Sequence, residues 1–204
     1  MAFARRRAWV AVLAAAVVVG GCGGGHEVAR VPPPPWRRPL HLPRLAAPGR
    51  CPLAPAHGRT FLGPAAGPGP VYLAGFDGRS ALPMFTQPRS RWAGQQVVVL
   101  ATARYQGPIL IRGGQVGGPG AVGFGGERVP ENELQLRAPG VSTTDEPPGW
   151  RAWLALIRVR TRGCYAVQVD GTSFSYAIVF EAQLRRAGPA PRRPSARARE
   201  PDAN

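Results

Sequence analysis

The chain has 204 residues and a formal net charge of +15, from 26 basic residues, all of them arginine, and 11 acidic residues. The excess positive charge lies mainly in two flanks, Gly23–Arg59 and Arg185–Asn204, whereas Thr60–Leu184 is close to balance. This middle segment is long enough for one ordinary hydrophobic core. It contains neither His nor Lys, which argues against catalysis by a histidine or lysine base and makes an enzyme the less favoured prediction.

The N-terminus has the order of a bacterial export signal. Met1–Arg7 is positively charged and Ala8–Val19 is an uncharged apolar run, too short for the roughly 20 residues that span a bilayer. Two glycines and Cys22 follow, and the whole resembles the lipobox of bacterial lipoproteins, in which the Cys thiol receives a diacylglycerol before the signal is removed. The resemblance implies a signal peptide over residues 1–21. It also implies a lipid anchor at Cys22, palmitate included, on the extracytoplasmic face of the cell membrane.

Two features of this signal leave alternatives open. An ordinary secretory signal followed by a chance cysteine would give an exported protein without the lipid. The adjacent Arg6 and Arg7 fit a loose twin-arginine pattern as well as the general secretory one, so both export routes remain open.

Both flanks have the composition of a disordered chain. Residues 22–39 are rich in Gly and Pro and are predicted to form an extended tether. Residues 185–204 are rich in Arg, Ala and Pro and are predicted to be a disordered basic tail. The tail either contacts anionic lipids or wall polymers or is a solvated arm without a partner. Nucleic acid is not an expected partner, because the protein is exported and the tail lacks aromatic residues for base stacking.

The remaining segment, residues 40–184, has a β pattern throughout. Trp150–Arg162 is the one run that resembles a helix, but Ile157 and Val159 alternate with arginines, and a period of two favours a strand. We therefore predict an all-β fold, an antiparallel immunoglobulin-like β-sandwich. The other predicted strands are short apolar runs bounded by Gly and Pro: Val71–Leu73, Gln95–Tyr105, Pro108–Ile111, Ala121–Phe124 and Leu134–Leu136.

The C-terminal part of this domain predicts a β-hairpin. Apolar residues alternate along Tyr165–Val169 and again along Phe174–Phe180, with an Asp-Gly pair between the two runs. A glycine two residues before Tyr165 resembles the tyrosine corner of immunoglobulin-like domains. The run GCYAVQVDGTSFSYAIVF also resembles the end of a group of uncharacterised Gram-positive and actinobacterial lipoproteins, which share the lipobox, Pro-rich spacer and β domain. That resemblance implies fold and location and carries no activity.

Two cysteines remain once Cys22 is assigned to the lipid. In an oxidising compartment an even remainder predicts a disulfide, here between Cys51 and Cys164; free buried thiols are the alternative. The bond would draw the end of the tether into the fold. The predicted ordered domain therefore begins near Leu40, although the Pro-rich composition alone would place its start near Thr60.

No catalytic, metal or cofactor site is predicted. Gly118–Gly123 matches a GxGxxG pattern but lies in a Gly-rich loop without the strand and helix that dinucleotide binding needs. His41, Cys51 and His57 lack the spacing and the fourth ligand of a zinc site. The carboxylates of Glu131, Glu133, Asp145 and Glu146 are interpreted as solvated charges. Ser142, Ser173 and Ser175 lack a nucleophile elbow, and the middle segment has no histidine to act as their base.

Two classes of function stay open. The favoured one is a non-catalytic envelope module with a structural role or with an unknown protein or glycan as its ligand. The alternative is a carboxylate-dependent hydrolase acting on cell-envelope polymers, which would need a cleft lined by two or more acids. Trp150 and Trp153 fit either a sugar-stacking platform or a tryptophan core, and the core is the favoured interpretation.

Overall fold

The structure is a computed structural model that describes residues 33–44, 51–53, 56–60, 63–77, 81–86, 90–137, 140–142 and 146–186. Within these residues the fold is all-β, as predicted: twelve strands form one sheet, preceded by the short 3-10 helix η1 (Pro35–Arg37). None of the described segments forms a helix long and apolar enough to cross a membrane. Cys22, the predicted signal peptide 1–21 and most of the predicted tail 185–204 lie outside the described residues.

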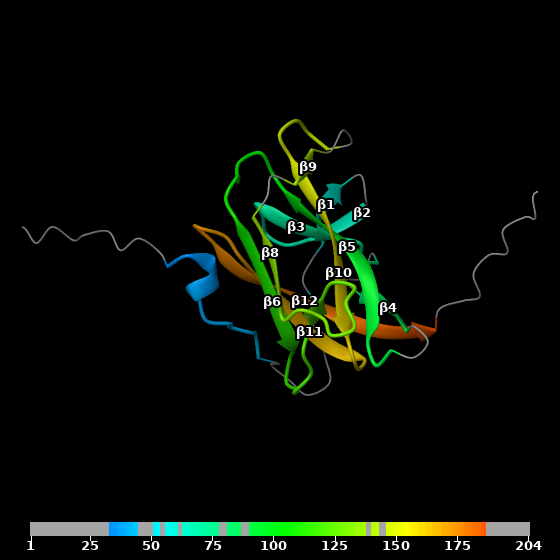
Figure 1. Ribbon diagram of the computed structural model, residues 1–204. Coiled ribbons are helices and arrows are strands. Elements are labelled where there is room, and N and C mark those ends of the chain that lie inside the picture. Colours follow the sequence, from blue (N-terminus) through cyan, green and yellow to red (C-terminus); the bar gives the residue numbers. More distant parts are fainter. Residues whose placement is uncertain are drawn as a thin grey trace, which may run out of the picture. The chain divides into compact units, whose positions relative to one another are not determined.

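The strands are short and follow one another along the described chain (Figure 1). Each predicted strand run overlaps one of them, whereas β1, β2, β4 and β9 have no counterpart in the prediction. The strands are β1 (Ala56–Thr60), β2 (Gly63–Ala66), β3 (Val71–Ala74), β4 (Ala81–Thr86), β5 (Ala93–Ala101), β6 (Ile109–Gln115), β7 (Gly123–Phe124), β8 (Glu133–Leu136), β9 (Val141–Ser142), β10 (Arg151–Val159), β11 (Gly163–Asp170) and β12 (Ser175–Arg186).

The hydrogen-bonded path through the sheet closes on itself. Across the sheet the strands follow in the order β10, β5, β4, β12, β11, β6 and β8. β7 completes the ring, because it pairs with β10 and is bridged from Phe124 to Glu131, just before β8. β1, β2 and β3 extend the sheet outward from β5 (Figure 1). The ring encloses the main hydrophobic core, to which most of its strands contribute buried side chains.

The sheet is mixed, so the prediction of a purely antiparallel arrangement is wrong in one place. β4 and β12 run parallel, with Ala81 opposite Glu181 and Thr86 opposite Arg186. These two strands are separated by most of the domain. The chain therefore has room to return in the same direction, whereas a tight hairpin would force the antiparallel one.

The predicted C-terminal hairpin is confirmed in its register. β11 and β12 pair with Tyr165 opposite Phe180 and Val167 opposite Ile178. All four side chains are fully buried, and the rings of Tyr165 and Phe180 stack with their centroids 6.0 Å apart. Because successive strand residues point to opposite faces, the alternation in the sequence turns this apolar face inward.

β10 confirms the strand interpretation of the segment around Ile157. It pairs with β5 along its whole length, and Ile157 and Val159 are buried in the main core, as the alternation predicts. Arg158 points to the other face and is nevertheless buried, with 7% of its surface exposed, whereas Arg160 is exposed. One arginine of the alternating series is therefore held inside the structure.

The ordered chain begins before its predicted start at Leu40. Pro35 is buried, and the terminal nitrogens of Arg38 donate to the carbonyl oxygens of Thr172 and Phe174 in the turn between β11 and β12. The predicted free tether over 22–39 is therefore wrong for its last residues. The planar guanidinium carries five N–H donors, and the Thr172 and Phe174 carbonyl oxygens accept from two of its nitrogens, so these contacts hold the segment on the sheet.

The C-terminal boundary is also displaced. β12 continues through Arg186 and pairs with β4, so Arg185 and Arg186 lie in a strand and not in the predicted disordered tail 185–204. Leu184 lies opposite Met84, which is fully buried. The ladder to β4 thus continues two residues beyond the predicted domain end at Leu184.

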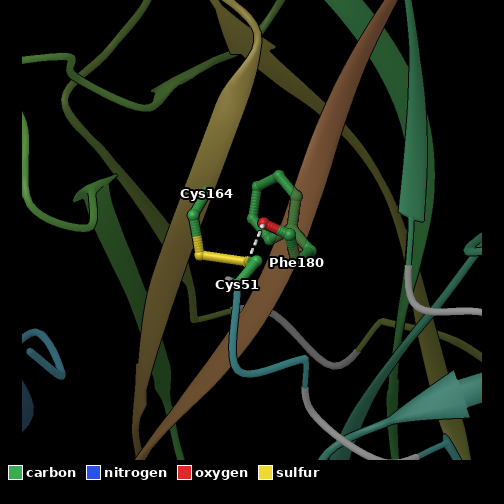
Figure 2. The surroundings of a disulfide bond; sticks show 3 residues. All are labelled: Cys51, Cys164 and Phe180. Carbon is green, nitrogen blue, oxygen red and sulfur yellow. Dashed lines mark hydrogen bonds between the residues drawn. A yellow bond between two sulfur atoms is a disulfide. The ribbon is translucent and has the colours of Figure 1, made fainter. Parts of the chain in front are cut away.

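The predicted disulfide is present. Cys51 and Cys164 are bonded across a sequence separation of 113, with their Cα atoms 5.3 Å apart. Figure 2 shows the bond beside β12, where the Cys51 sulfur lies 3.6 Å from the carbonyl oxygen of Phe180. Both cysteines pack against a small buried cluster around Ala166. The bond fastens the chain ahead of β1 to the start of β11.

Candidate functional site

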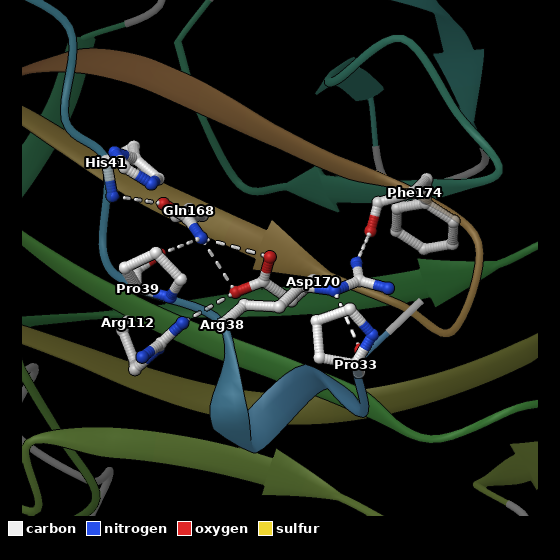
Figure 3. A network of polar contacts seen from close by, with 8 residues as sticks. All are labelled: Pro33, Arg38, Pro39, His41, Arg112, Gln168, Asp170 and Phe174. Carbon is white, nitrogen blue, oxygen red and sulfur yellow. Dashed lines mark hydrogen bonds and ion pairs between the residues drawn. The ribbon is translucent and has the colours of Figure 1, made fainter. Parts of the chain in front are cut away.

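A buried polar network joins the N-terminal segment to β6 and β11 (Figure 3). The carboxylate of Asp170, which is fully buried, accepts from Arg112 Nη2 at 2.8 Å. The Gln168 amide nitrogen donates to both Asp170 oxygens, at 3.0 and 2.9 Å, and to the Pro39 carbonyl oxygen at 3.1 Å. The backbone amide of His41 donates to Gln168 Oε1 at 2.6 Å.

We assign this network to holding the N-terminal segment on the sheet. A buried carboxylate is tolerated only when it is paired and hydrogen-bonded, and Asp170 has both an ion pair and amide donors. Its side chain has no exposed surface, so the carboxylate does not meet a substrate. The network and the Arg38 contacts therefore act as one structural clamp over residues 33–41.

A cleft of about 680 Å³ opens where β3 and β10 meet the end of β5. β3 and β10 pair with opposite edges of β5, and Val71 and Arg151 both lie opposite Ala101. This register brings Tyr72 and Trp150 together. Their rings stack, with centroids 6.1 Å apart and planes inclined by 8°, and both rings line the cleft. We refer to it as the Tyr72–Trp150 cleft.

The walls of the Tyr72–Trp150 cleft contain four prolines and offer both polar and apolar surface. Apart from the two rings, its polar side chains are Thr102 and Arg104. The Thr102 hydroxyl is buried without a hydrogen-bond partner in the described part of the chain, and Arg104 is exposed. No acidic side chain is among the described residues that line the cleft. The prolines of the walls are Pro68 and Pro70, before β3, and Pro147 and Pro148, before β10.

The two tryptophans considered for a sugar platform have different surroundings. Trp153 packs against the main core, and the guanidinium of Arg151 lies 4.9 Å from its ring centroid. Trp150 packs with Tyr72 against a second, smaller cluster that contains Leu100. Both indoles are half-buried. The core interpretation therefore fits Trp153, whereas Trp150 faces a cleft.

Tyr165 makes two contacts at the turn between β10 and β11. Its hydroxyl donates to the carbonyl oxygen of Thr161 at 3.0 Å and lies 2.8 Å from the Thr161 hydroxyl. A hydrogen bond to the backbone a few residues upstream is the contact that a tyrosine corner makes. Tyr165 thus fixes the direction in which the chain enters β11.

The residues considered as metal ligands have other roles. Cys51 is bonded to Cys164, so it has no thiolate to offer a metal. His41 belongs to the clamp through its backbone amide, and His57 lies in β1. Among the described residues there is no group of three His, Cys, Asp or Glu side chains that could hold a metal ion.

The carboxylates considered for hydrolysis are dispersed. Glu131 is exposed, and Glu133 accepts a hydrogen bond from Gln135 on the same strand. Glu146 lies in the loop before β10, whereas Asp145 lies outside the described residues. Of these groups, the three that the structure describes, Glu131, Glu133 and Glu146, do not line the Tyr72–Trp150 cleft.

The remaining sequence candidates lie in turns and strands. Gly118–Gly123 runs from a turn directly into β7, and no helix follows it within residues 90–137. Ser142 ends β9, Ser173 is exposed in the turn after β11, and Ser175 is exposed at the start of β12. In the described residues around Gly118–Gly123, Ser173 and Ser175, no helix follows a strand as a nucleotide loop or a nucleophile elbow requires.

Sequence reasoning missed Tyr72 as a candidate site residue. The available signal was its position: Tyr72 follows Pro70 at the start of one strand, and Trp150 follows Pro148 at the start of another. Two aromatic residues that each lie close to the start of a strand, just after a proline, are candidates for the same end of a sheet.

Neither a protein-family model nor a curated protein matches this chain. The function is therefore inferred from the geometry of the Tyr72–Trp150 cleft and from the signals in the sequence.

Proposed function

We propose that the protein is a lipid-anchored extracytoplasmic module that binds a glycan of the cell envelope, without catalysis, in the Tyr72–Trp150 cleft. The observation that carries the proposal is the parallel stack of two aromatic rings in a Pro-walled cleft that has no acidic side chain among its described lining residues.

Each part of this cleft suits a sugar ring. The apolar carbon face of a pyranose packs on an aromatic ring, and Tyr72 and Trp150 offer a fixed pair of rings at low entropic cost. Ligand hydroxyls need hydrogen-bond partners placed around that surface. Arg104 lines the cleft and is an exposed donor of such hydrogen bonds. The cleft volume of about 680 Å³ lies within the ordinary range for small-ligand sites.

The hydrolase alternative receives no support from this cleft. Glycoside hydrolysis needs two carboxyl groups on either side of the bond to be broken. The described residues that line the cleft supply none, and the buried Asp170 is committed to Arg112. Binding without turnover is the chemistry that the cleft supports best.

The anchor and the immunoglobulin-like assignment belong to the same proposal. The lipobox at Cys22 supports a lipid anchor, and the resemblance of the C-terminal run to envelope lipoproteins supports the location. The contact from Tyr165 to Thr161 and the disulfide at the start of β11 support an immunoglobulin-like relationship for the β10–β12 part of the sheet.

The anchor is tested by Cys22→Ala. Without the thiol there is no lipid attachment, and the chain is expected in the soluble extracytoplasmic fraction or in the medium. Quantitative immunoblotting of washed membranes measures the change. A variant that remains on salt-washed membranes at the wild-type level refutes the lipid anchor, while the binding proposal remains open to its own test.

The binding site is tested with soluble glycan fragments released from cell wall, added to the purified full chain and followed by calorimetry. Trp150→Ala is expected to reduce affinity about five- to thirtyfold, since loss of a stacking ring removes roughly 1–2 kcal/mol. Trp36→Ala is the matched control, because Trp36 is 51% exposed and does not line this cleft. Equal affinities for the two variants contradict the site. Release of shortened fragments by the wild-type chain favours the hydrolase.

A further inference from the structure

A second cleft, of about 400 Å³, lies near the C-terminal end of β10, and four of its nine lining residues are arginines. Its lining also includes one indole ring and one serine. We call it the arginine cleft. The residues that matter are Arg91, Arg128, Arg158, Arg160, Trp92 and Ser90.

Arg158 is a buried cation that is held in place by neutral groups. Its Nη1 donates to the carbonyl oxygens of Gly125 and Glu127, and its Nη2 lies 3.3 Å from the Ser90 hydroxyl oxygen. Only 7% of its surface is exposed. The ion pair found among the described residues is that of Arg112 with Asp170, and Arg158 has none there. A buried guanidinium without a carboxylate leaves positive charge that an anion would stabilise.

A second guanidinium is brought close to the first by Trp92. The Arg160 guanidinium carbon lies 4.6 Å from the centroid of the Trp92 ring, and that of Arg158 lies 5.9 Å from the same centroid. The Trp92 backbone amide donates to the Ser90 hydroxyl at 3.0 Å, which fixes the start of this segment. Cation–π contacts hold both cations near one ring, although like charges at such separations repel each other.

The rim of the cleft adds charge of the same sign. Arg91 and Arg128 are exposed and line it, and the acidic side chain among the lining residues is that of Glu127, which is exposed. Four arginines against one glutamate make the cleft strongly positive, and a concave surface concentrates that potential. The partner that this arrangement selects is an anion small enough to enter.

We propose that the arginine cleft binds the phosphate group of a phosphate ester. Guanidinium groups recognise tetrahedral phosphate through paired, charge-assisted hydrogen bonds, and several guanidiniums around one site match the oxygens of one phosphate. The volume has room for the phosphate together with a short polyol or sugar. Such a group occurs in the headgroup of an anionic lipid and in soluble phosphate esters. The site is independent of the glycan cleft and of the anchor.

The chemistry is tested by calorimetric titration of glycerol 3-phosphate into the full chain carrying Cys22→Ala, with glycerol as the uncharged control. Arg160→Gln is expected to weaken binding about tenfold, because a charge-assisted contact is lost. Glu127→Gln is expected to tighten binding a few-fold, because it removes the acidic group of the rim. Higher salt is expected to weaken the binding of glycerol 3-phosphate to both variants, because it screens the charges. Arg137→Gln is the charge-matched control, since Arg137 is exposed and does not line the cleft.

A sedimentation arm distinguishes the sources of phosphate. Vesicles of phosphatidylglycerol in phosphatidylcholine replace the soluble ester. Binding that Arg160→Gln abolishes and Arg137→Gln retains identifies a lipid headgroup as a ligand, and the same pattern with glycerol 3-phosphate identifies a soluble ester. Absence of binding in both arms overturns the proposal. Equal losses for Arg160→Gln and Arg137→Gln also overturn it, because general charge would then explain the effect.

Discussion

Cys51 precedes Cys164 by 113 residues, and the disulfide between them fastens the chain ahead of β1 to the first residues of β11. The same N-terminal region is attached a second time, through the clamp formed by Arg38, Gln168 and Asp170. Both attachments reach β11 or the turn that follows it. The incoming chain is thus part of the fold before the first strand begins.

The disulfide is predicted to be a major contributor to stability. Cys164→Ser is expected to lower the free energy of unfolding by about 4–5 kcal/mol, because the bond closes a loop of more than 100 residues in the unfolded chain. Urea unfolding of the oxidised protein measures the change. Cys51→Ser should give the same loss, and the double variant should lose no more than either single one. An unchanged midpoint would contradict the prediction.

Asp170→Asn is predicted to destabilise the domain by about 3 kcal/mol, because it leaves the Arg112 guanidinium without its charged partner in a buried site. Thermal unfolding at neutral pH measures the effect. The control is a double-mutant cycle with Arg112→Gln, in which the second change should cost much less once Asp170 is replaced. Additive losses would show that the two groups do not act as a pair.

Variants in the tyrosine corner and in the core beside it are predicted to lose different amounts of unfolding free energy. Tyr165→Phe removes the hydroxyl that donates to Thr161 and is expected to cost about 1 kcal/mol. Phe180→Ala removes a fully buried ring opposite Tyr165 and is expected to cost about 3–5 kcal/mol. Denaturant midpoints measure both. Leu154→Ala, at a position 69% exposed, is the control and should change little.

The stability of the domain is predicted to fall in alkaline solution through Tyr176. Burial raises the pKa of the Tyr176 hydroxyl above its ordinary value of 10.0. In the unfolded chain this tyrosine ionises as the pH passes 10, whereas in the folded chain it stays protonated and donates to the Val71 carbonyl oxygen. The contribution is therefore complete below pH 10 and is lost as the pH rises, by at most about 1.4 kcal/mol per pH unit.

Tyr176→Phe checks this prediction, because phenylalanine does not ionise. Between pH 9 and 11 the free energy of unfolding of the variant should fall less steeply than that of the wild type. If the unfolding free energies of the variant and the wild type fall equally steeply with pH, Tyr176 is not the cause of the alkaline loss of stability. Tyr72→Phe, which changes a tyrosine on β3, serves as the comparison.

The parts of the fold that the sequence predicted depend on local patterns. The hairpin from Tyr165 to Phe180 follows from alternation on both sides of an Asp-Gly turn, and the pairing register agrees with it. β4 escaped prediction because Pro83 interrupts its pattern, and proline is disfavoured inside strands. Its pairing with β12 joins Pro83 to Gln183, a contact that no local window contains.

The candidate sites were harder to predict because they depend on register. Tyr72 and Trp150 meet only because β3 and β10 both pair with β5 at Ala101. The arginine cleft was hidden for a related reason. Arg158 and Arg160 belong to the alternation that identifies a strand, and their partner Trp92 lies far away in the sequence, just before β5. Composition suggested binding through the flanking arginines, whereas the structure gathers four arginines within the folded domain.

The double attachment of the N-terminal segment also decides how the domain carries mechanical load. Tension on the chain ahead of Pro33 is met first by Arg38 and Gln168 and then by the covalent bond at Cys51. Each of these contacts is made to β11 or to the turn before β12. The force passes directly into that hairpin and bypasses residues 52–163, which contain β1 through β10 and the Tyr72–Trp150 cleft. A pull on the N-terminal side therefore loads the β11–β12 hairpin before it loads the strands around the Tyr72–Trp150 cleft.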